Sequence, residues 1–172
     1  HPRMSDTITI RTSGASDLAE VDALLARAYP RLLAGHYLPS VMVTALPLIA
    51  RARPDLLTSG TYYLAVDPDG RVIGGGGWTF GAPAGGARQA RIGHIRHFVT
   101  DDRAVRRGIG RALMGHVLRE AGDAGITMLD CLSTRMAVPF YAAMGFSDVG
   151  VVSVPLRPGI DFPAVRMQRV LP

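Results

Sequence analysis

The chain has 172 residues, enough to bury the core of one domain and too few for two of ordinary size. Apolar residues make up 48% and charged residues 19% of the sequence, which excludes the disordered, collagen-like and coiled-coil classes. The formal net charge of +5 favours an anionic ligand, either small or polymeric.

The N-terminal elements are predicted from apolar spacing and from turn residues. The three residues before Met4 are interpreted as a remnant, so the domain is expected to span residues 4–172. A strand over residues 7–11 precedes an amphipathic helix, which Pro30 is expected to end. A second helical region over residues 38–52 is expected to break at Pro47.

Three β-rich runs follow, over residues 61–66, 71–80 and 91–99, and the first two are joined by an Asp-Pro-Asp-Gly turn. They are predicted to form a meander. Four consecutive glycines, residues 74–77, lie inside the second run rather than before a helix. We interpret them as backbone that accommodates a close neighbour.

The C-terminal half alternates helices and strands. Helices are predicted over residues 107–122 and 138–144, and strands over residues 126–132, 146–154 and 165–171. The whole order, β-α-α-β-β-β-α-β-α-β-β, predicts a single α/β domain. Its mixed sheet is expected to have about seven strands, with about four helices on its faces.

The residue types limit location and chemistry. The longest apolar stretch, residues 41–50, is well short of the roughly 18 to 20 residues that cross a bilayer. No apolar signal segment follows the start, and the single cysteine, Cys131, excludes an internal disulfide, so we expect a cytoplasmic protein. All 19 basic residues are arginine, so no lysine can form a Schiff base. A glutamate base would have to be Glu20 or Glu120.

A candidate anion site opens the helix predicted to start near residue 107. Gly108 and Gly110 allow close backbone approach, and the unpaired N–H groups and the dipole of a helix start favour negative charge. The pattern predicts a pyrophosphate site, although glycines also begin helices for steric reasons. It is neither a Walker A loop nor a full dinucleotide fingerprint. Four cations accompany it: Arg103, Arg106, Arg107 and Arg111.

A second motif lies downstream, where Ser133, Thr134 and Ala137 precede the segment Phe-Tyr-Ala-Ala-Met-Gly-Phe of residues 140–146. With both motifs in order, the chain resembles the GCN5-related N-acetyltransferase (GNAT) family over residues 91–146. That family pairs a (Q/R)xxGxG turn and a long helix with a later Asn-x-x-Ala-x-x-Phe-Tyr-x-x-x-Gly-Phe segment. The chain looks most like bacterial members that carry an STxxAxPFYxxxGF variant.

The resemblance implies a GNAT fold and transfer of an acyl group from acetyl-CoA, or another acyl-CoA, to an amine of a small molecule. It implies that the backbones of Phe98 and Val99 pair with pantetheine and that Thr134, in the family's Asn position, lies beside the cofactor arm. Val105 replaces the usual Gln or Arg, and Thr134 removes an amide donor. The residues implied to cradle the pyrophosphate are Arg106, Arg107, Gly108, Ile109, Gly110 and Arg111.

The resemblance places the hydroxyl of Tyr141 toward the departing thiol. Full proton transfer from a tyrosine of pKa ~10 to a thiolate of pKa ~8.5 is uphill by roughly 2 kcal/mol, so Tyr141 is expected to act as a hydrogen-bond donor. The family's strand glutamate is absent, which leaves His94 and His97 as candidate bases. Strand alternation predicts that they face opposite sides of the sheet, so at most one faces the acceptor.

Other functions remain open at this stage. The missing glutamate and Thr134 favour a non-catalytic acyl-CoA-binding regulatory module as one alternative. An acetyltransferase of aminoacyl-tRNA or of a protein N-terminal amine is another, ranked lower because the arginines cluster at one turn. Cys131 is interpreted as a structural thiol in preference to an acyl-carrying nucleophile. No metal site is expected, and a homodimer is typical of the family.

Overall fold

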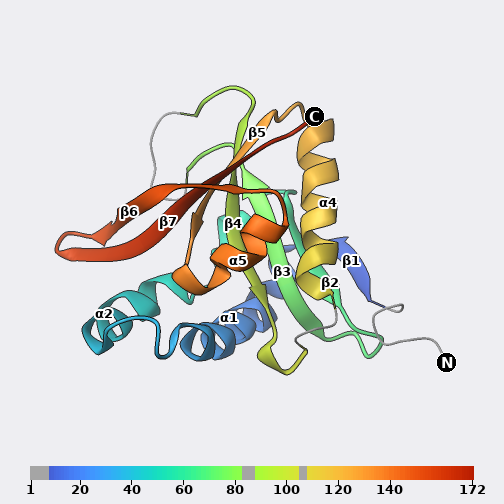
Figure 1. Cartoon of the computed structure of the whole chain (residues 1–172). Helices are drawn as coiled ribbons and strands as arrows, with labels where there is room; N and C mark the ends of the chain where they lie inside the picture. The colour runs from blue at the N-terminus through green and yellow to red at the C-terminus, as the bar shows by residue number, and fades with distance from the viewer. Residues whose placement is uncertain (1–7, 83–87, 105–107) are drawn as a thin grey trace.

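The computed structural model describes residues 8–82, 88–104 and 108–172. Their seven strands form one sheet in the order β1-β2-β3-β4-β5-β7-β6 (Figure 1). The helices are α1 (Leu18–Leu33), α2 (Pro39–Ile49), α3 (Pro54–Leu57), α4 (Ile109–Asp123) and α5 (Val138–Ala143), with single turns η2 (Ala15–Asp17), η3 (Asp102–Ala104) and η4 (Arg135–Ala137). The strands are β1 (Thr9–Thr12), β2 (Tyr62–Val66), β3 (Val72–Thr79), β4 (Ile92–Thr100), β5 (Met128–Ser133), β6 (Ser147–Arg157) and β7 (Ile160–Val170).

The predicted meander is confirmed, since β2, β3 and β4 pair antiparallel in that order. The turn between β2 and β3 forms because Asp67 Oδ1 accepts the backbone N–H groups of Asp69 and Arg71, while Gly70 takes a positive φ of 84°. Strand β5 then runs parallel to β4, which requires the crossover that α4 supplies. The predicted mixed α/β sheet is therefore also confirmed.

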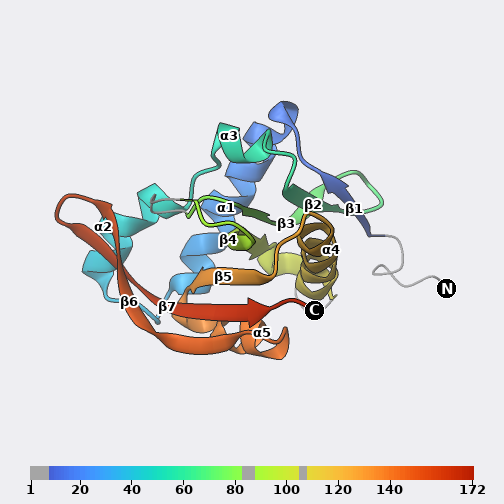
Figure 2. The same cartoon turned by 90° about the horizontal axis from the view of Figure 1, so that it is seen from above.

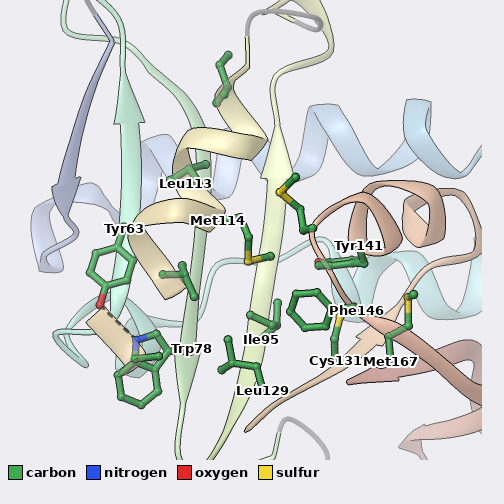
Figure 3. Close-up of a cluster of buried hydrophobic side chains, with 14 of the residues drawn as sticks. Tyr63, Trp78, Ile95, Leu113, Met114, Leu129, Cys131, Tyr141, Phe146 and Met167 are labelled. Carbon is green, nitrogen blue, oxygen red and sulfur yellow. Dashed lines mark hydrogen bonds between the residues drawn. The ribbon is translucent and has the colours of Figure 1, made fainter. Parts of the chain in front are cut away.

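The helices cover both faces of the sheet (Figure 2). Helix α1 packs Leu24 and Leu25 on the face that carries Leu64. Helix α4 packs Leu113 and Met114 on the other face, against strand residues that Figure 3 shows around them. Among the described residues, no helix is both long enough and apolar enough to cross a membrane.

Two prolines do not end helices as predicted. Helix α1 continues through Pro30 to Leu33, and it stops where Gly35 takes a positive φ of 80°. Helix α2 likewise continues through Pro47 to its end at Ile49. Packing overrides the local cost of proline here, because the last turn of α1 buries Leu33 against α2 and β7.

The C-terminal strands are longer than predicted. Strand β7 begins at Ile160 rather than at residue 165 and forms a long hairpin with β6. Pro163 pairs with Ser153 in this hairpin, beyond the last β5 partner of β7, which is Val165. Proline is tolerated there because that edge of β7 has no ladder bond to lose. The short helix α3 was not predicted at all.

The glycine run of β3 is confirmed as a close backbone approach. A Cβ on Gly75 would lie 2.6 Å from the Tyr62 hydroxyl, and one on Gly77 would overlap the backbone carbonyl of Thr61. Real Cβ atoms avoid such distances, and backbone cannot rotate away as a side chain can. These glycines therefore leave room for the Tyr62 side chain where β3 pairs with β2.

We expect Gly77→Ala to lower the free energy of unfolding by about 2–3 kcal/mol, because its methyl group meets backbone. Urea denaturation followed by circular dichroism measures the change. Gly81→Ala is the matched control, since its Cβ would meet nothing within 4 Å, and its effect should stay within about 0.5 kcal/mol. Equal unfolding midpoints for the two variants would contradict the prediction.

Candidate active site

Strands β4 and β5 pair over only part of their length. Their register runs from Ile92 with Met128 to His94 with Asp130, although β4 continues to Thr100 and β5 to Ser133. Beyond that register, β4 bonds to β3 and β5 bonds to β7. The two strands therefore part within the sheet, and the backbone edges that face each other beyond this point are available to a ligand.

A cavity of about 430 Å³ lies where the strands part, within the usual size range of small-molecule sites. Its walls come from the end of α1, the separated parts of β4 and β5, η3, the start of α4, and the segment from Thr134 through η4 to α5. The lining residues used below are Tyr29, Leu32, Leu33, His97, Phe98, Val99, Gly108, Ile109, Gly110, Arg111, Cys131, Thr134, Phe140 and Tyr141.

The start of α4 contributes backbone donors to this cavity. Gly108 has a positive φ of 72°, and its carbonyl accepts the first helical hydrogen bond of α4, from the N–H of Ala112. The N–H groups of residues 109–111 therefore have no carbonyl of a preceding helical turn to donate to. A Cβ on Gly110 would lie 3.0 Å from the Phe140 ring, so glycine keeps α4 close to α5. Arg106 and Arg107, which were predicted to bind pyrophosphate, lie outside the described residues.

One predicted cation is engaged elsewhere. Arg103 donates to both oxygens of Asp101, at 3.2 and 3.1 Å, and Arg27 of α1 contacts the same carboxylate at 2.6 Å. Burial alone would raise the pKa of Asp101, but the hydrogen bonds from Arg103 and the charge of Arg27 lower it to about 2. Arg103 therefore anchors the segment before the glycine turn. Of the two predicted cations that the structure describes, Arg103 and Arg111, Arg111 lines the cavity.

Strand β4 carries a bulge at His97. Arg96 pairs with Gly77 and Val99 with Gly75, so His97 and Phe98 together oppose Gly76. His97 takes a positive φ of 43°, and its carbonyl accepts a hydrogen bond of 2.8 Å from Tyr62 Oη. The prediction that His94 and His97 face opposite sides of the sheet assumed regular alternation of side chains along β4. The bulge interrupts that alternation between the two residues.

His97 is neutral at physiological pH. Burial is the largest cause, and the nearby charges of Arg96 and Arg53 add to it, so that the pKa of His97 falls to about 4. Its Nδ1 is buried without a hydrogen-bond partner among the described residues. The cavity wall therefore contains a neutral imidazole.

His94 lies outside the cavity lining. Its Nδ1 is 3.7 Å from Asp130 Oδ2, while Arg166 Nε and Gln168 Nε2 donate to Asp130 Oδ1 at 2.9 and 3.1 Å. Burial alone would raise the pKa of Asp130, but His94, Arg166 and Gln168 together lower it. No group of three His, Cys, Asp or Glu side chains in the described ranges could hold a metal ion.

Tyr141 and Cys131 meet inside the cavity wall. Tyr141 comes from α5 and Cys131 from β5. Figure 3 shows the Tyr141 ring near Phe146, and the ring centroids of these two residues are 5.5 Å apart. Burial, followed by the proximity of Cys131, raises the pKa of Tyr141 well above its ordinary value. Burial raises the pKa of Cys131 to about 12, against a smaller opposing effect from Tyr141. A thiolate at Cys131 is therefore disfavoured, as its structural interpretation requires.

The structure thus brings most of the predicted site residues to one cavity: Tyr141, His97, Phe98, Val99, Gly108, Ile109, Gly110, Arg111 and Thr134. Sequence reasoning did not assign Leu32 and Leu33 of α1 to the site, although they form part of the wall beside Tyr29. Their apolar spacing marks them only as core residues. No local signal distinguishes a core side chain from one that lines a cavity.

Comparisons with known proteins agree with this geometry. Residues 55–169 match the family model described as acetyltransferase (GNAT) domain. No curated protein matches the chain. Similar folds include a GCN5-related N-acetyltransferase from Rhodopseudomonas palustris, with a TM-score of 0.76 and 21% identity over 99% of both chains.

Two further similar structures were solved with coenzyme A. PaiA N-acetyltransferase from Thermoplasma acidophilum has a TM-score of 0.72 and 16% identity, over 95% of this chain and 98% of its own. N-acetylglutamate synthase from Neisseria gonorrhoeae, solved with coenzyme A and N-acetyl-glutamate, has a TM-score of 0.61 and 19% identity. That match covers 96% of this chain and 35% of the synthase.

Proposed function

Because the chain belongs to the GNAT family of N-acetyltransferases, with acyl-CoA as co-substrate, we propose that it acetylates an amine of a small molecule by direct attack. The observation that carries this proposal is that the glycine turn of α4, His97 and Tyr141 line one and the same cavity. A concave site of this kind favours a small acceptor over a macromolecular one.

The described residues fit the acyl donor. The unpaired amides at the start of α4, together with Arg111, suit a pyrophosphate, and the free edges of β4 and β5 suit the amide groups of pantetheine. We assign Phe98 and Val99 to the pantetheine arm, Gly108 to Arg111 to the pyrophosphate, and Thr134 to the arm's inner end. The bound donor supplies a thioester carbonyl to the acceptor.

His97 is proposed to take the proton that the amine loses during attack. With a pKa near 4, it is too weak a base to deprotonate an ammonium group of pKa about 7.7 or above before attack. The acceptor must therefore arrive neutral, and its nitrogen becomes acidic enough to protonate the neutral imidazole of His97 only as the new bond forms. His94 keeps the alternative role of a base acting through water, from beside Asp130.

Thiol release from acetyl-CoA in the presence of an amine panel tests the proposed function, and calorimetry with coenzyme A tests donor binding separately. We expect both binding and amine-dependent thiol release. Tight binding without release across the panel would favour the non-catalytic module. Absence of binding would contradict the site itself, and acetylation of aminoacyl-tRNA or peptides alone would contradict the small acceptor.

The pH dependence of kcat/KM follows from the lowered pKa of His97. Because His97 is already unprotonated above pH about 4, the rate should rise with pH as the acceptor amine loses its own proton. The inflection should move with the pKa of the acceptor when two amines of different basicity are compared. A fixed inflection near the ordinary histidine pKa of about 6.5, the same for both amines, would contradict this assignment.

A further inference from the structure

The hydroxyl groups of the five tyrosines differ in their hydrogen bonding. Three of them form a hydrogen bond of 2.8 to 3.3 Å with a described residue, and these belong to Tyr37, Tyr62 and Tyr63. The other two tyrosines, Tyr29 and Tyr141, are the ones among the described residues that line the cavity between β4 and β5. Since the hydroxyl of a buried tyrosine normally has a partner, the cavity contains the two hydroxyls that a ligand can engage.

Tyr29 is held in place by its ring and not by its hydroxyl. The side chain packs against two apolar clusters, one formed by α1 with β2 and one formed by α2 with β7. Its hydroxyl has no hydrogen bond within the described parts of the chain, and its oxygen is not among the enclosed unpaired atoms there, so the cavity can reach it. A fixed ring with an unpaired hydroxyl at a cavity wall is suited to bind a polar atom of a ligand.

Tyr29 and Tyr141 approach the same point from opposite faces of the sheet. Tyr141 belongs to the core on the α4 face, whereas Tyr29 packs with the core on the α1 face. Burial, followed by the proximity of Cys131 on β5, raises the pKa of both tyrosines, and Tyr29 raises that of Tyr141 further. The two hydroxyls therefore converge beside Cys131, where β4 and β5 have parted.

Both phenols are hydrogen-bond donors and not bases. Burial raises the pKa of Tyr29 to about 12, so its hydroxyl keeps its proton at physiological pH. The proposed reaction develops negative charge on two atoms in turn, the carbonyl oxygen of the thioester and then its sulfur. Tyr141 is assigned to the sulfur. The carbonyl oxygen is therefore left for the donor that enters from the other face of the sheet.

We propose that Tyr29 is a further catalytic residue, whose hydroxyl donates a hydrogen bond to the carbonyl oxygen of the acyl group where β4 and β5 part. The inference rests on the proposed function and adds a residue to its mechanism. As the amine nitrogen bonds to the carbonyl carbon, an electron pair moves to the carbonyl oxygen beside Tyr29. The nitrogen gives its proton to His97, the pair returns as the carbon–sulfur bond breaks, and the sulfur leaves as a thiolate beside Tyr141.

Replacing Tyr29 with phenylalanine tests this assignment. Tyr29→Phe should lower kcat at least thirtyfold, by the same factor for two acceptor amines of different size, and should leave the Kd for coenzyme A within about twofold. Coenzyme A has no acyl carbonyl, so its binding does not use the lost hydrogen bond. The unfolding midpoint should not fall, because the hydroxyl has no partner within the described protein. Tyr63→Phe is the control and should show the reverse, a lower midpoint with kcat within about twofold.

Two unreactive analogues of acetyl-CoA give a second readout that needs no turnover. One is the methyl ketone in which a methylene group replaces the thioester sulfur, and the other is the matching hydrocarbon without the ketone oxygen. Calorimetry should find the ketone at least threefold tighter than the hydrocarbon in the unchanged protein, and this preference should be lost in Tyr29→Phe.

Three results would each overturn the assignment of Tyr29. They are an unchanged kcat in Tyr29→Phe, a loss that differs between the two acceptors, and a ketone preference that survives the substitution. A lower unfolding midpoint with unchanged ketone preference would show a structural role and overturn it as well. In each case, coenzyme A binding and acetyl transfer by the unchanged protein would leave the proposed function intact. Absence of any transfer by the unchanged protein would instead contradict the proposed function, while the analogues would still decide the contact of Tyr29.

Discussion

Replacing Tyr141 with phenylalanine should lower kcat about a hundredfold while leaving the Kd for coenzyme A within about twofold. The hydroxyl is the proposed donor to the departing thiolate, in a wall where burial holds its pKa well above the ordinary value. A donor of such high pKa keeps its proton, so it stabilises the thiolate by a hydrogen bond that strengthens as charge develops. Phenylalanine keeps the ring contacts with Phe98, Phe140 and Phe146.

Single-turnover kinetics with saturating acetyl-CoA measures this effect, and calorimetry measures donor binding. Tyr63→Phe is the matched control, since Tyr63 is a buried tyrosine whose hydroxyl accepts from Trp78 Nε1 at 3.3 Å, away from the cavity lining (Figure 3). Its kcat should stay within about twofold while its stability falls by about 1 kcal/mol. Full activity of Tyr141→Phe would remove Tyr141 from the mechanism.

Replacing Gly108 with valine should weaken coenzyme A binding about thirtyfold. A β-branched residue is strained at the positive φ of 72° that Gly108 adopts, by roughly 2 kcal/mol. The turn escapes this strain by changing conformation, which redirects the amides at the start of α4. Binding coenzyme A must then restore the direction of these amides at a cost of about 2 kcal/mol. Since about 1.4 kcal/mol corresponds to tenfold in Kd, this cost corresponds to about thirtyfold.

Titration calorimetry with coenzyme A measures the Kd, and thermal unfolding checks that the variant folds. Gly122→Ala in the same helix is the control, because a Cβ there meets nothing within 4 Å and Gly122 has no positive φ. It should bind coenzyme A normally and be stabilised by about 0.5–1 kcal/mol. Unchanged affinity in Gly108→Val would show that the turn does not bind the pyrophosphate.

The local features of the fold were predictable because each is encoded within a few residues. Apolar spacing predicted α1 and α4, and the Asp-Pro-Asp-Gly turn predicted the hairpin of β2 and β3. The prolines of α1 and α2 misled the prediction, since a proline costs a helix about 3 kcal/mol and the burial of apolar residues such as Leu33 offsets it. Helix boundaries therefore depended on contacts that a local pattern does not contain.

By itself, the sequence determined the α/β class, the family and the two segments proposed to carry its chemistry, because short local motifs of glycine, arginine and tyrosine encode them. Only the tertiary structure decided the parting of β4 and β5 and the bulge at His97. Each of these depends on which distant residues pack together. Burial and neighbouring charges, which set the pKa of His97 and of Tyr141, arise only when the chain is folded.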